Sequence, residues 1–582
     1  MGDDRIIPTP ASRDLPTFKI MISGSEINGE YRVLSVDVTK IYNRIATAKI
    51  ILFDGDPATE DFKVSNTNDF KPGNEIEVLA GYHSDEKTIF KGIIIKHGIK
   101  AKKEKASQLV IEAKDAAVKL TVGRKSAYFY DVSDSDIIED LCKKASVKTD
   151  VESISIKHKE MVQHYTTDWD FIISRAEMNG LPVLTDDNTL TIKKIDTNAS
   201  PALTLIYGST LLEFEAEMDA RTLYPSVKSY SWNYKDQAVA DSDASDPSVN
   251  ETGNIKSTEL ADVMGIKEFS LKHSGNIQNG DLKSWSDASL LKSKLSKIRG
   301  RAKCQGFADV KPGSVIELKG VGDRFNGKVL VSGVRHAIDT GNWETDVQFG
   351  MNNDWFYKNE DIVEKPASGL LPGINGLQVG VVVQLESDPD GEDRIQVRIP
   401  IIDSKEVGTW ARVATLDAGD TRGSFFRPEL DDEVIVGFIN DDPRDAVVLG
   451  MMNSSAKPAP LTASDDNYQK GFFTKSKMKL LFDDEKKSIT IETPAGKSIV
   501  IDDDAGTITA TDENSNKIEM SSDGITIESA ADLKLKASGD VTIEGTNVSS
   551  KASAQFKAEG SAGAELSTGA SAVVKGSVVQ IN

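Results

Sequence analysis

The chain has 582 residues, with 91 acidic against 69 basic side chains and a formal net charge of −22 at pH 7. This length exceeds what one hydrophobic core supports, so we expect several domains. The negative charge argues against nucleic-acid binding, and no apolar run in the sequence approaches the roughly eighteen residues that a membrane-spanning helix requires.

The cysteine content and the amino terminus both indicate a protein that folds in a reducing compartment. Only two cysteines occur, Cys142 and Cys304, so a disulfide framework is not expected. Residues 1–16 carry acidic residues and prolines where a secretory signal would carry basic residues and then an apolar stretch. We therefore expect the chain to be made in the cytoplasm.

Residues 1–365 mix alternating apolar segments with a few helices, which predicts an α+β domain. A helix is expected to begin with Ser133 or Ser135 as its N-cap, because the apolar residues that follow share one face. These residues are Ile137, Ile138, Leu141 and Cys142, so the thiol of Cys142 is expected in the core. Strands with period-two alternation are predicted over 18–22, 48–52 and 109–113.

Two further helices and one polar segment complete this region. One helix is predicted from Thr167 to Gly180, since an acidic residue three positions after the threonine resembles a capping box and glycine is a typical stop. Another helix is predicted over 286–299, with Gly300 in the stop position. Residues 236–258 are polar and acidic, and we expect a disordered segment or a surface loop there.

A second domain is predicted over 377–455, after the proline- and glycine-rich segment 366–376. Five short apolar strands separated by polar turns within this length favour a small closed barrel of the oligonucleotide/oligosaccharide-binding (OB) type. The acidic turns of this barrel argue against a nucleic-acid ligand. The strands are expected over 380–383, 395–399, 409–413, 433–438 and 446–450.

The last region, residues 470–582, is a repeat of short strands. Each strand carries a pair of apolar residues, and one strand alone cannot bury them, so the core must come from stacking. The inward residues shrink to alanine and then return to valine and isoleucine, which favours a narrow prism of three intertwined chains. The predicted core residues are Ile489, Ile491, Ile499, Ile501, Ile508, Ile518, Ile525, Ile527, Leu533, Leu535, Val541 and Ile543.

The order of these parts resembles the VgrG spike proteins of type VI secretion systems and their relatives in phage-derived extracellular contractile injection systems. In the first region the resemblance rests on DWDFIISRAEMNG (168–180) and on the segment 312–336. The barrel carries the most specific motifs, which are DPDG (388–391), VRIP (397–400), WARV (410–413), PELDDEV (428–434) and DPR (442–444).

The resemblance implies a mainly β fold with three parts: an α+β phage hub-like domain (1–365), an OB-fold neck (377–455) and a triple-stranded intertwined β-helix needle (470–582). It implies a homotrimeric structural spike that caps the inner tube, contacts baseplate proteins and punctures a target envelope. The spike would be made in the bacterial cytoplasm and assembled into a contractile particle, either released or membrane-anchored, and would contact the target membrane transiently.

The resemblance also implies that a small PAAR tip protein docks on the last residues of the needle. These are Val578, Val579, Gln580, Ile581 and Asn582. Family members that carry an effector do so beyond the needle, so any toxin is expected to be a separate protein.

No catalytic, cofactor-binding or metal-binding residues are predicted. The G-x-x-x-x-G-K spacing of Gly322 to Lys328 precedes a strand rather than a helix, which indicates a hairpin turn. Asp388, Asp390 and Asp393 lack the pattern of a calcium loop, and the six histidines are scattered singly. The alternative that stays open is a trimeric cell-wall hydrolase with a catalytic front half.

Overall fold

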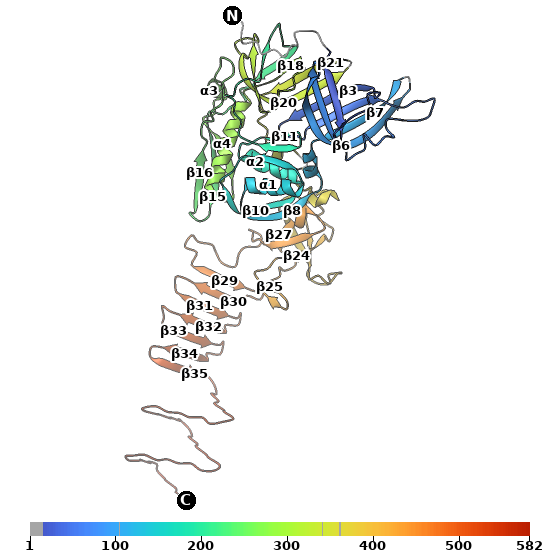
Figure 1. Cartoon of the computed structure of the whole chain (residues 1–582). Helices are drawn as coiled ribbons and strands as arrows, with labels where there is room; N and C mark the ends of the chain where they lie inside the picture. The colour runs from blue at the N-terminus through green and yellow to red at the C-terminus, as the bar shows by residue number, and fades with distance from the viewer. Residues whose placement is uncertain (1–14, 104, 340, 360–361, 582) are drawn as a thin grey trace. The chain divides into compact units, whose positions relative to one another are not determined.

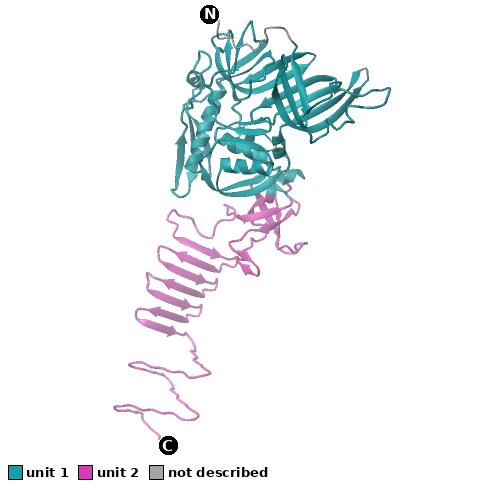
Figure 2. Ribbon diagram, in the orientation of Figure 1, with its two compact units in different colours: residues 1–375, 440–443 teal, residues 376–439, 444–582 magenta. Residues whose placement is uncertain are grey.

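The computed structural model describes residues 15–103, 105–339, 341–359 and 362–581. The chain forms two compact units, one made of residues 1–375 with 440–443 and the other of residues 376–439 with 444–582 (Figure 2). Strands dominate both units (Figure 1). None of the helices in this described part combines the length and apolar composition that crossing a membrane requires.

The first unit is built on a 13-stranded sheet, and the strands predicted over 18–22, 48–52 and 109–113 are all part of it. The order along the sheet is β14 (Glu213–Met218), β18 (Ile298–Gln305), β21 (Asn342–Phe349), β20 (Gly327–Asp339), β3 (Val33–Ile41), β4 (Thr47–Phe53), β7 (Lys105–Lys114), β6 (Asp85–Lys102), β5 (Glu75–Tyr82), β1 (Thr17–Ile22) and β2 (Ser25–Glu26). Two further strands, β13 (Leu203–Ile206) and β19 (Val315–Lys319), join it through β20.

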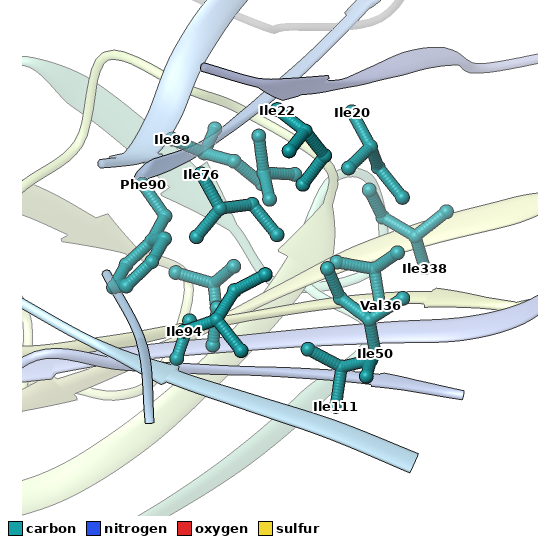
Figure 3. Packing of buried hydrophobic residues seen from close by; sticks show 14 of the residues in the cluster. Ile20, Ile22, Val36, Ile50, Ile76, Ile89, Phe90, Ile94, Ile111 and Ile338 are labelled. Atoms are coloured by element: carbon teal, nitrogen blue, oxygen red, sulfur yellow. The ribbon is translucent and has the colours of Figure 1, made fainter. Parts of the chain in front are cut away.

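Period-two alternation produces the cores beneath this sheet, because every second side chain of a strand points to the same face. One core gathers buried side chains of β1, β3 to β7 and the end of β20 (Figure 3). Its labelled members are Ile20, Ile22, Val36, Ile50, Ile76, Ile89, Phe90, Ile94, Ile111 and Ile338. A separate core lies under β13, β14 and β18 to β21.

The helical part of this unit confirms two sequence predictions. Ser133 caps α1 (Asp134–Lys144) with a complete capping box, and Cys142 is fully buried. Thr167 caps α2 (Asp168–Met178) by accepting a hydrogen bond from the Asp170 amide. The elements around these helices are η1 (Ala116–Thr121), β8 (Lys125–Ser133), β9 (Lys148–Val151), β10 (Lys157–Thr166), β11 (Val183–Asp186) and β12 (Thr189–Ile192).

The third predicted helix was wrong at both ends. The helix α4 spans Asn279–Leu295, and the predicted stop, Gly300, lies inside strand β18. The chain leaves the helix at Ser296 because Ile298 is needed in the core beneath the sheet, paired with β14. A glycine suits this strand because a Cβ on Gly300 would lie 2.2 Å from the carbonyl oxygen of Glu215.

The prediction of a disordered segment or surface loop over 236–258 holds only in part, since residues 244–256 contain no helix or strand but the residues before them do. Residues 238–243 form β16 (Ala238–Asp243), which pairs with β15 (Val227–Asn233), while β17 (Phe269–His273) lies on the other side of β15. Ion pairs of Lys294 with Asp246 and of Lys297 with Glu251 hold the rest of the segment against the end of α4. The segment then enters α3 (Ser257–Ala261) and η2 (Asp262–Met264).

The second unit begins with a closed barrel, which confirms the OB-type prediction. Its strand order is β22 (Gln378–Gln384), β23 (Ile395–Arg398), β24 (Thr409–Val413), β28 (Ala446–Met451) and β27 (Glu433–Phe438), with β24 and β28 parallel. A small hairpin, β25 (Ala418–Gly419) and β26 (Arg422–Gly423), lies between β24 and β27. Short 3-10 turns, η3 (Phe356–Lys358), η4 (Pro366–Gly369) and η5 (Ile439–Asp441), belong to the connecting segments.

Gly380 is required inside this barrel, and its replacement gives a testable prediction. A Cβ there would lie 2.5 Å from Val397 Cγ1 and 2.8 Å from Val436 Cγ2, so Gly380→Ala is expected to destabilise the barrel by about 1–3 kcal/mol. Hydrogen exchange of the barrel strands measures this loss. Gly450→Ala is the matched control, because a Cβ there meets nothing within 4 Å; equal protection in both variants would contradict the prediction.

The barrel is followed by a seven-stranded antiparallel sheet in simple sequence order. Its strands are β29 (Gln469–Phe473), β30 (Lys479–Asp483), β31 (Ser488–Glu492), β32 (Ser498–Asp502), β33 (Thr507–Thr511), β34 (Lys517–Ser521) and β35 (Gly524–Glu528). Residues 529–581 are described but contain no helix or strand. The short strands predicted around the first five apolar pairs are confirmed.

Candidate functional site

The seven-stranded sheet places all its predicted apolar pairs on one face. Ile489 stands opposite Ile501, and Ile501 stands opposite Ile508 on the next strand. A second column runs beside the first, in which Ile491 faces Ile499 and Ile499 faces Ala510. The pattern continues through β34 and β35, where Ile518, Met520, Ile525 and Ile527 pair directly. We call this surface the apolar face of the sheet.

The apolar face is not covered by any other part of the chain that the structure describes. The exposed fraction of Ile499 is 48% and that of Ile527 is 53%. Side chains of this size are normally buried, and an exposed patch that crosses several strands indicates an interaction surface. The remaining large side chains on this face, Phe472, Phe482, Ile489, Ile491, Ile501, Ile508, Ile518, Met520 and Ile525, are also exposed.

The opposite face of the same sheet is mostly polar. Thr490 pairs with Val500, and Val500 pairs with Thr509. Near the margins, Lys479 Nζ lies 2.7 Å from a carboxylate oxygen of Glu492. The alternation of one polar and one apolar face is the pattern of a sheet that is covered on one side only.

The other predicted needle-core residues, Leu533, Leu535, Val541 and Ile543, lie beyond the last strand and are exposed in the single chain. The predicted tip-docking residues Val578, Val579 and Ile581 are exposed as well, and Gln580 belongs to the same exposed end. Asn582 lies outside the described residues. The sequence prediction for these positions stays a prediction.

A contact between the barrel and the first strands of the seven-stranded sheet was not predicted from the sequence. Phe426 stacks on Phe472 of β29, with ring centroids 5.3 Å apart. Lys475 Nζ lies 2.9 Å from Glu429 Oε2, which joins the turn after β29 to the loop before β27. Contacts between residues so far apart in sequence have no local signal. The Phe426–Phe472 stacking and the Lys475–Glu429 ion pair attach β29, the first strand of the sheet, to the barrel.

The first unit carries a charged groove of about 630 Å³ on the solvent face of its large sheet. Arg299, Arg301 and Arg335 line it together with Glu215 and Glu217. These charges are paired, since Arg299 Nη2 lies 2.7 Å from Glu217 Oε1 and Arg335 pairs with Asp37. The groove therefore offers a polar surface with no nucleophile or paired acid and base set apart for chemistry.

The two sequence motifs that resemble a phosphate-binding loop and a calcium loop are turns between strands. The Gly322 to Lys328 segment connects the antiparallel strands β19 and β20, which confirms the predicted hairpin turn. Asp388 lies in the turn between β22 and β23, where hydrogen bonds from Arg394 hold the pKa of its carboxyl well below its usual range. This confirms the predicted turn.

The cysteines and one histidine are unsuited to reactions at neutral pH. Burial raises the pKa of both thiols, Cys142 and Cys304, to about 12. Burial also lowers the pKa of His336 to about 3, with smaller effects from Lys40 and Lys311. Among the described residues, no group of three or more histidine, cysteine, aspartate or glutamate side chains is arranged to hold a metal ion.

Comparison with known families gives two matches. The model of the family described as the Alg8 N-terminal domain matches residues 12–340. The model described as the type VI secretion system/phage-baseplate injector OB domain matches residues 378–452. The second match covers the closed barrel and confirms the resemblance to spike proteins of these systems. No curated protein matches the sequence.

Several solved structures are similar to the chain at low identity. The 43 kDa tail protein of prophage MuSo2 from Shewanella oneidensis is 10% identical, with 58% of this chain and 99% of that chain covered and a TM-score of 0.44. An E. coli type VI secretion component is 12% identical, with 75% and 100% covered and a TM-score of 0.38. A Francisella PdpA–VgrG complex is 12% identical, with 89% and 81% covered and a TM-score of 0.39. These scores are too low to establish a common function.

Proposed function

The chain belongs to the Alg8 N-terminal domain family and carries an injector OB domain, and from this premise we propose that it is the homotrimeric spike of a contractile injection system. In this proposal residues 1–365 form a hub on the inner tube, residues 377–455 a neck and residues 470–582 a needle. The role is structural: the needle concentrates force on a small area of a target envelope.

The observation that carries this proposal is the apolar face of the seven-stranded sheet. A single chain leaves this face in water, whereas three chains around one axis cover each other's faces and keep the polar faces outside. Burying a half-exposed isoleucine contributes on the order of 1 kcal/mol. With eleven large apolar side chains on the face of each chain, the gain over three chains is on the order of 30 kcal/mol, against roughly 8–30 kcal/mol for the two association steps.

The partners follow from the same assignment. The hub would bind inner-tube and baseplate proteins, and the exposed residues 578–581 would receive a PAAR-type tip protein, with effectors carried as separate proteins. The particle would be assembled in the bacterial cytoplasm and act outside the cell or in the target. We propose no enzymatic activity, because none of the buried or grooved regions described above sets apart a reactive group.

The mass of the purified chain in solution tests the proposal. Light scattering is expected to give three times the 63.1 kDa of one chain, and the trimer should resist detergent because unfolding requires intertwined chains to separate. A chain ending near residue 460 lacks the apolar face and is expected to lose that resistance. A full-length monomer would instead require the repeats to fold as a single-chain structure, and the spike proposal would be withdrawn.

A further inference from the structure

The hairpin formed by β6 and β7 extends beyond the strands on either side of it (Figure 1). On one side, the pairing of β6 with β5 ends at Ile93, although β6 continues to Lys102. On the other side, the pairing of β7 with β4 ends at Gln108. From Lys96 to Lys102, β6 pairs only with β7 among the described strands, at residues 105–112, and its outer edge is open. We call this part of the β6–β7 ribbon the basic prong. Among the described residues, no strand pairs with the outer edge of β6 along the prong.

The prong is basic in a chain that is otherwise strongly acidic. Lys96 and Lys100 lie on the same face of β6 as Gly98, and Lys102 follows after a bulge. All three lysines are exposed, and none has an ion-pair partner among the described residues. On the other face of the ribbon, Ile99 is 50% exposed. The free edge of β6 thus carries positive charge on one face and an apolar side chain on the other.

The opposite end of the large sheet carries the complementary pattern. Its last strand, β14, pairs only with β18 among the described strands, so its outer edge is open. Glu213, Glu215 and Glu217 alternate on the solvent face of this strand. Phe214 and Met218 lie on the inner face, half-buried against the core under β18 to β21. This edge carries negative charge on one face and apolar side chains on the other.

We infer that the basic prong of one copy pairs, strand to strand, with the outer edge of β14 in the next copy. Lys96 and Lys100 lie four residues apart on one face, as Glu213 and Glu217 do, so one register of pairing makes both lysines direct neighbours of glutamates. The same pairing covers Ile99 with the apolar edge formed by Phe214 and Met218. Backbone groups left open at both edges also gain hydrogen-bond partners.

The contact joins different copies because the two edges are far apart in one sheet. Six strands, β18, β21, β20, β3, β4 and β7, lie between β14 and β6 in the sheet order. A contact between two different surfaces is heterologous, and it closes into a ring when the rotation between copies is one third of a turn. The inference therefore rests on the proposed homotrimer and assigns to its hub a contact that is separate from the needle.

The lysines have another explanation, since charged residues on an open strand edge commonly prevent unwanted pairing. Two features favour a specific contact. The exposed Ile99 would weaken a purely protective edge. The glutamates of β14 already pair with basic residues of β18, for example Glu213 with Lys303 at 2.8 Å, so lysines from another copy would extend an existing ladder of alternating charge.

Carbodiimide crosslinking of the purified full-length chain tests the inference. The reagent forms an amide between a lysine amine and a carboxylate in contact, with loss of water. We expect covalent dimers and trimers on a denaturing gel, and mass spectrometry should find peptides that join residues 96–102 to residues 213–217. The Lys303–Glu213 pair within one chain is the internal positive control.

The variant K96E/K102E keeps the amine of Lys100 as a reporter and reverses the charges beside it. Crosslinks from Lys100 to residues 213–217 are expected to fall about tenfold or more, because like charges then face each other. K157E/K159E, which reverses two exposed lysines of β10, should leave them unchanged. A trimer by light scattering that yields the control crosslink but no prong crosslink overturns this inference and leaves the proposed spike intact. A monomer by light scattering overturns both.

Discussion

Replacing Ile499 and Ile508 with aspartate is expected to convert the proposed trimer into separate chains. Both side chains lie on the apolar face, on the neighbouring strands β32 and β33. In a needle of three chains the variant would place six carboxylates around one narrow axis, without water and without basic partners. An ion buried unpaired costs several kcal/mol, which exceeds the gain from burying the isoleucines. Light scattering measures the mass, and a denaturing gel without heating measures the resistance to detergent.

The control variant places the same charges on the other face. Val500→Asp and Thr509→Asp lie on the same two strands, directly paired with each other, but on the polar face. These carboxylates would remain in water, so we expect a trimer with unchanged detergent resistance. If both variants dissociate, aspartate acts by weakening the strands themselves. If neither does, the apolar face is not the trimer interface.

Local patterns allowed much of the fold to be predicted from the sequence. The helices capped by Ser133 and Thr167 begin at those residues because the cap and the apolar face lie within a few positions of each other. The strands of the seven-stranded sheet were predicted for a similar reason, since each apolar pair, such as Ile489 and Ile491, lies on one strand. The barrel was predicted by its five strands and its turn motifs together.

The errors occurred where distant residues decide the local structure. The acidic segment 236–258 has too few apolar residues to order itself. It is ordered by Lys294 at the end of α4, by Lys297 just after that helix and by pairing with β15. The end of α4 was misplaced because Ile298 continues the helical spacing, although the core beneath the sheet needs it in a strand. Neither the residues that order segment 236–258 nor the core that receives Ile298 can be identified from the nearby sequence.

Local patterns predicted one of the candidate surfaces, and distant strand pairing concealed the others. The apolar face could be predicted from period-two alternation along the last strands, because every apolar residue there has its partner on an adjacent strand. The basic prong and the acidic edge of β14 were missed, since their meaning depends on which strand edges stay open. Strand order in a sheet of distant segments is not readable from composition or local alternation.

Asp134→Ala is expected to destabilise the helical part of the first unit by about 3–5 kcal/mol. Asp134 is buried at the start of α1 and accepts hydrogen bonds from Arg175 Nε at 2.7 Å and Asn179 Nδ2 at 2.9 Å. Its Oδ1 also lies 3.3 Å from Nε2 of the buried His158. Removing the carboxylate leaves the guanidinium without its partner in a largely water-free site. Hydrogen exchange of the α1 and α2 amides measures the loss locally, which matters because a chain of several domains does not unfold in one step.

Asp140→Ala on the same helix is the matched control. Asp140 lies on the exposed side of α1 and pairs with Lys144 one turn later, 2.6 Å apart, so its loss should cost about 0.3–0.5 kcal/mol. The pH dependence of stability also separates the native chain from the Asp134→Ala variant. Burial favours the protonated form of Asp134, but the hydrogen bonds and charge of Arg175 outweigh it and lower the pKa. A carboxyl with a lowered pKa stabilises the fold above its ordinary pKa and loses that effect as the pH falls. Acidification should therefore weaken the native chain more than the Asp134→Ala variant. Equal pH sensitivity of these two proteins would show that the buried ion pair does not stabilise the first unit.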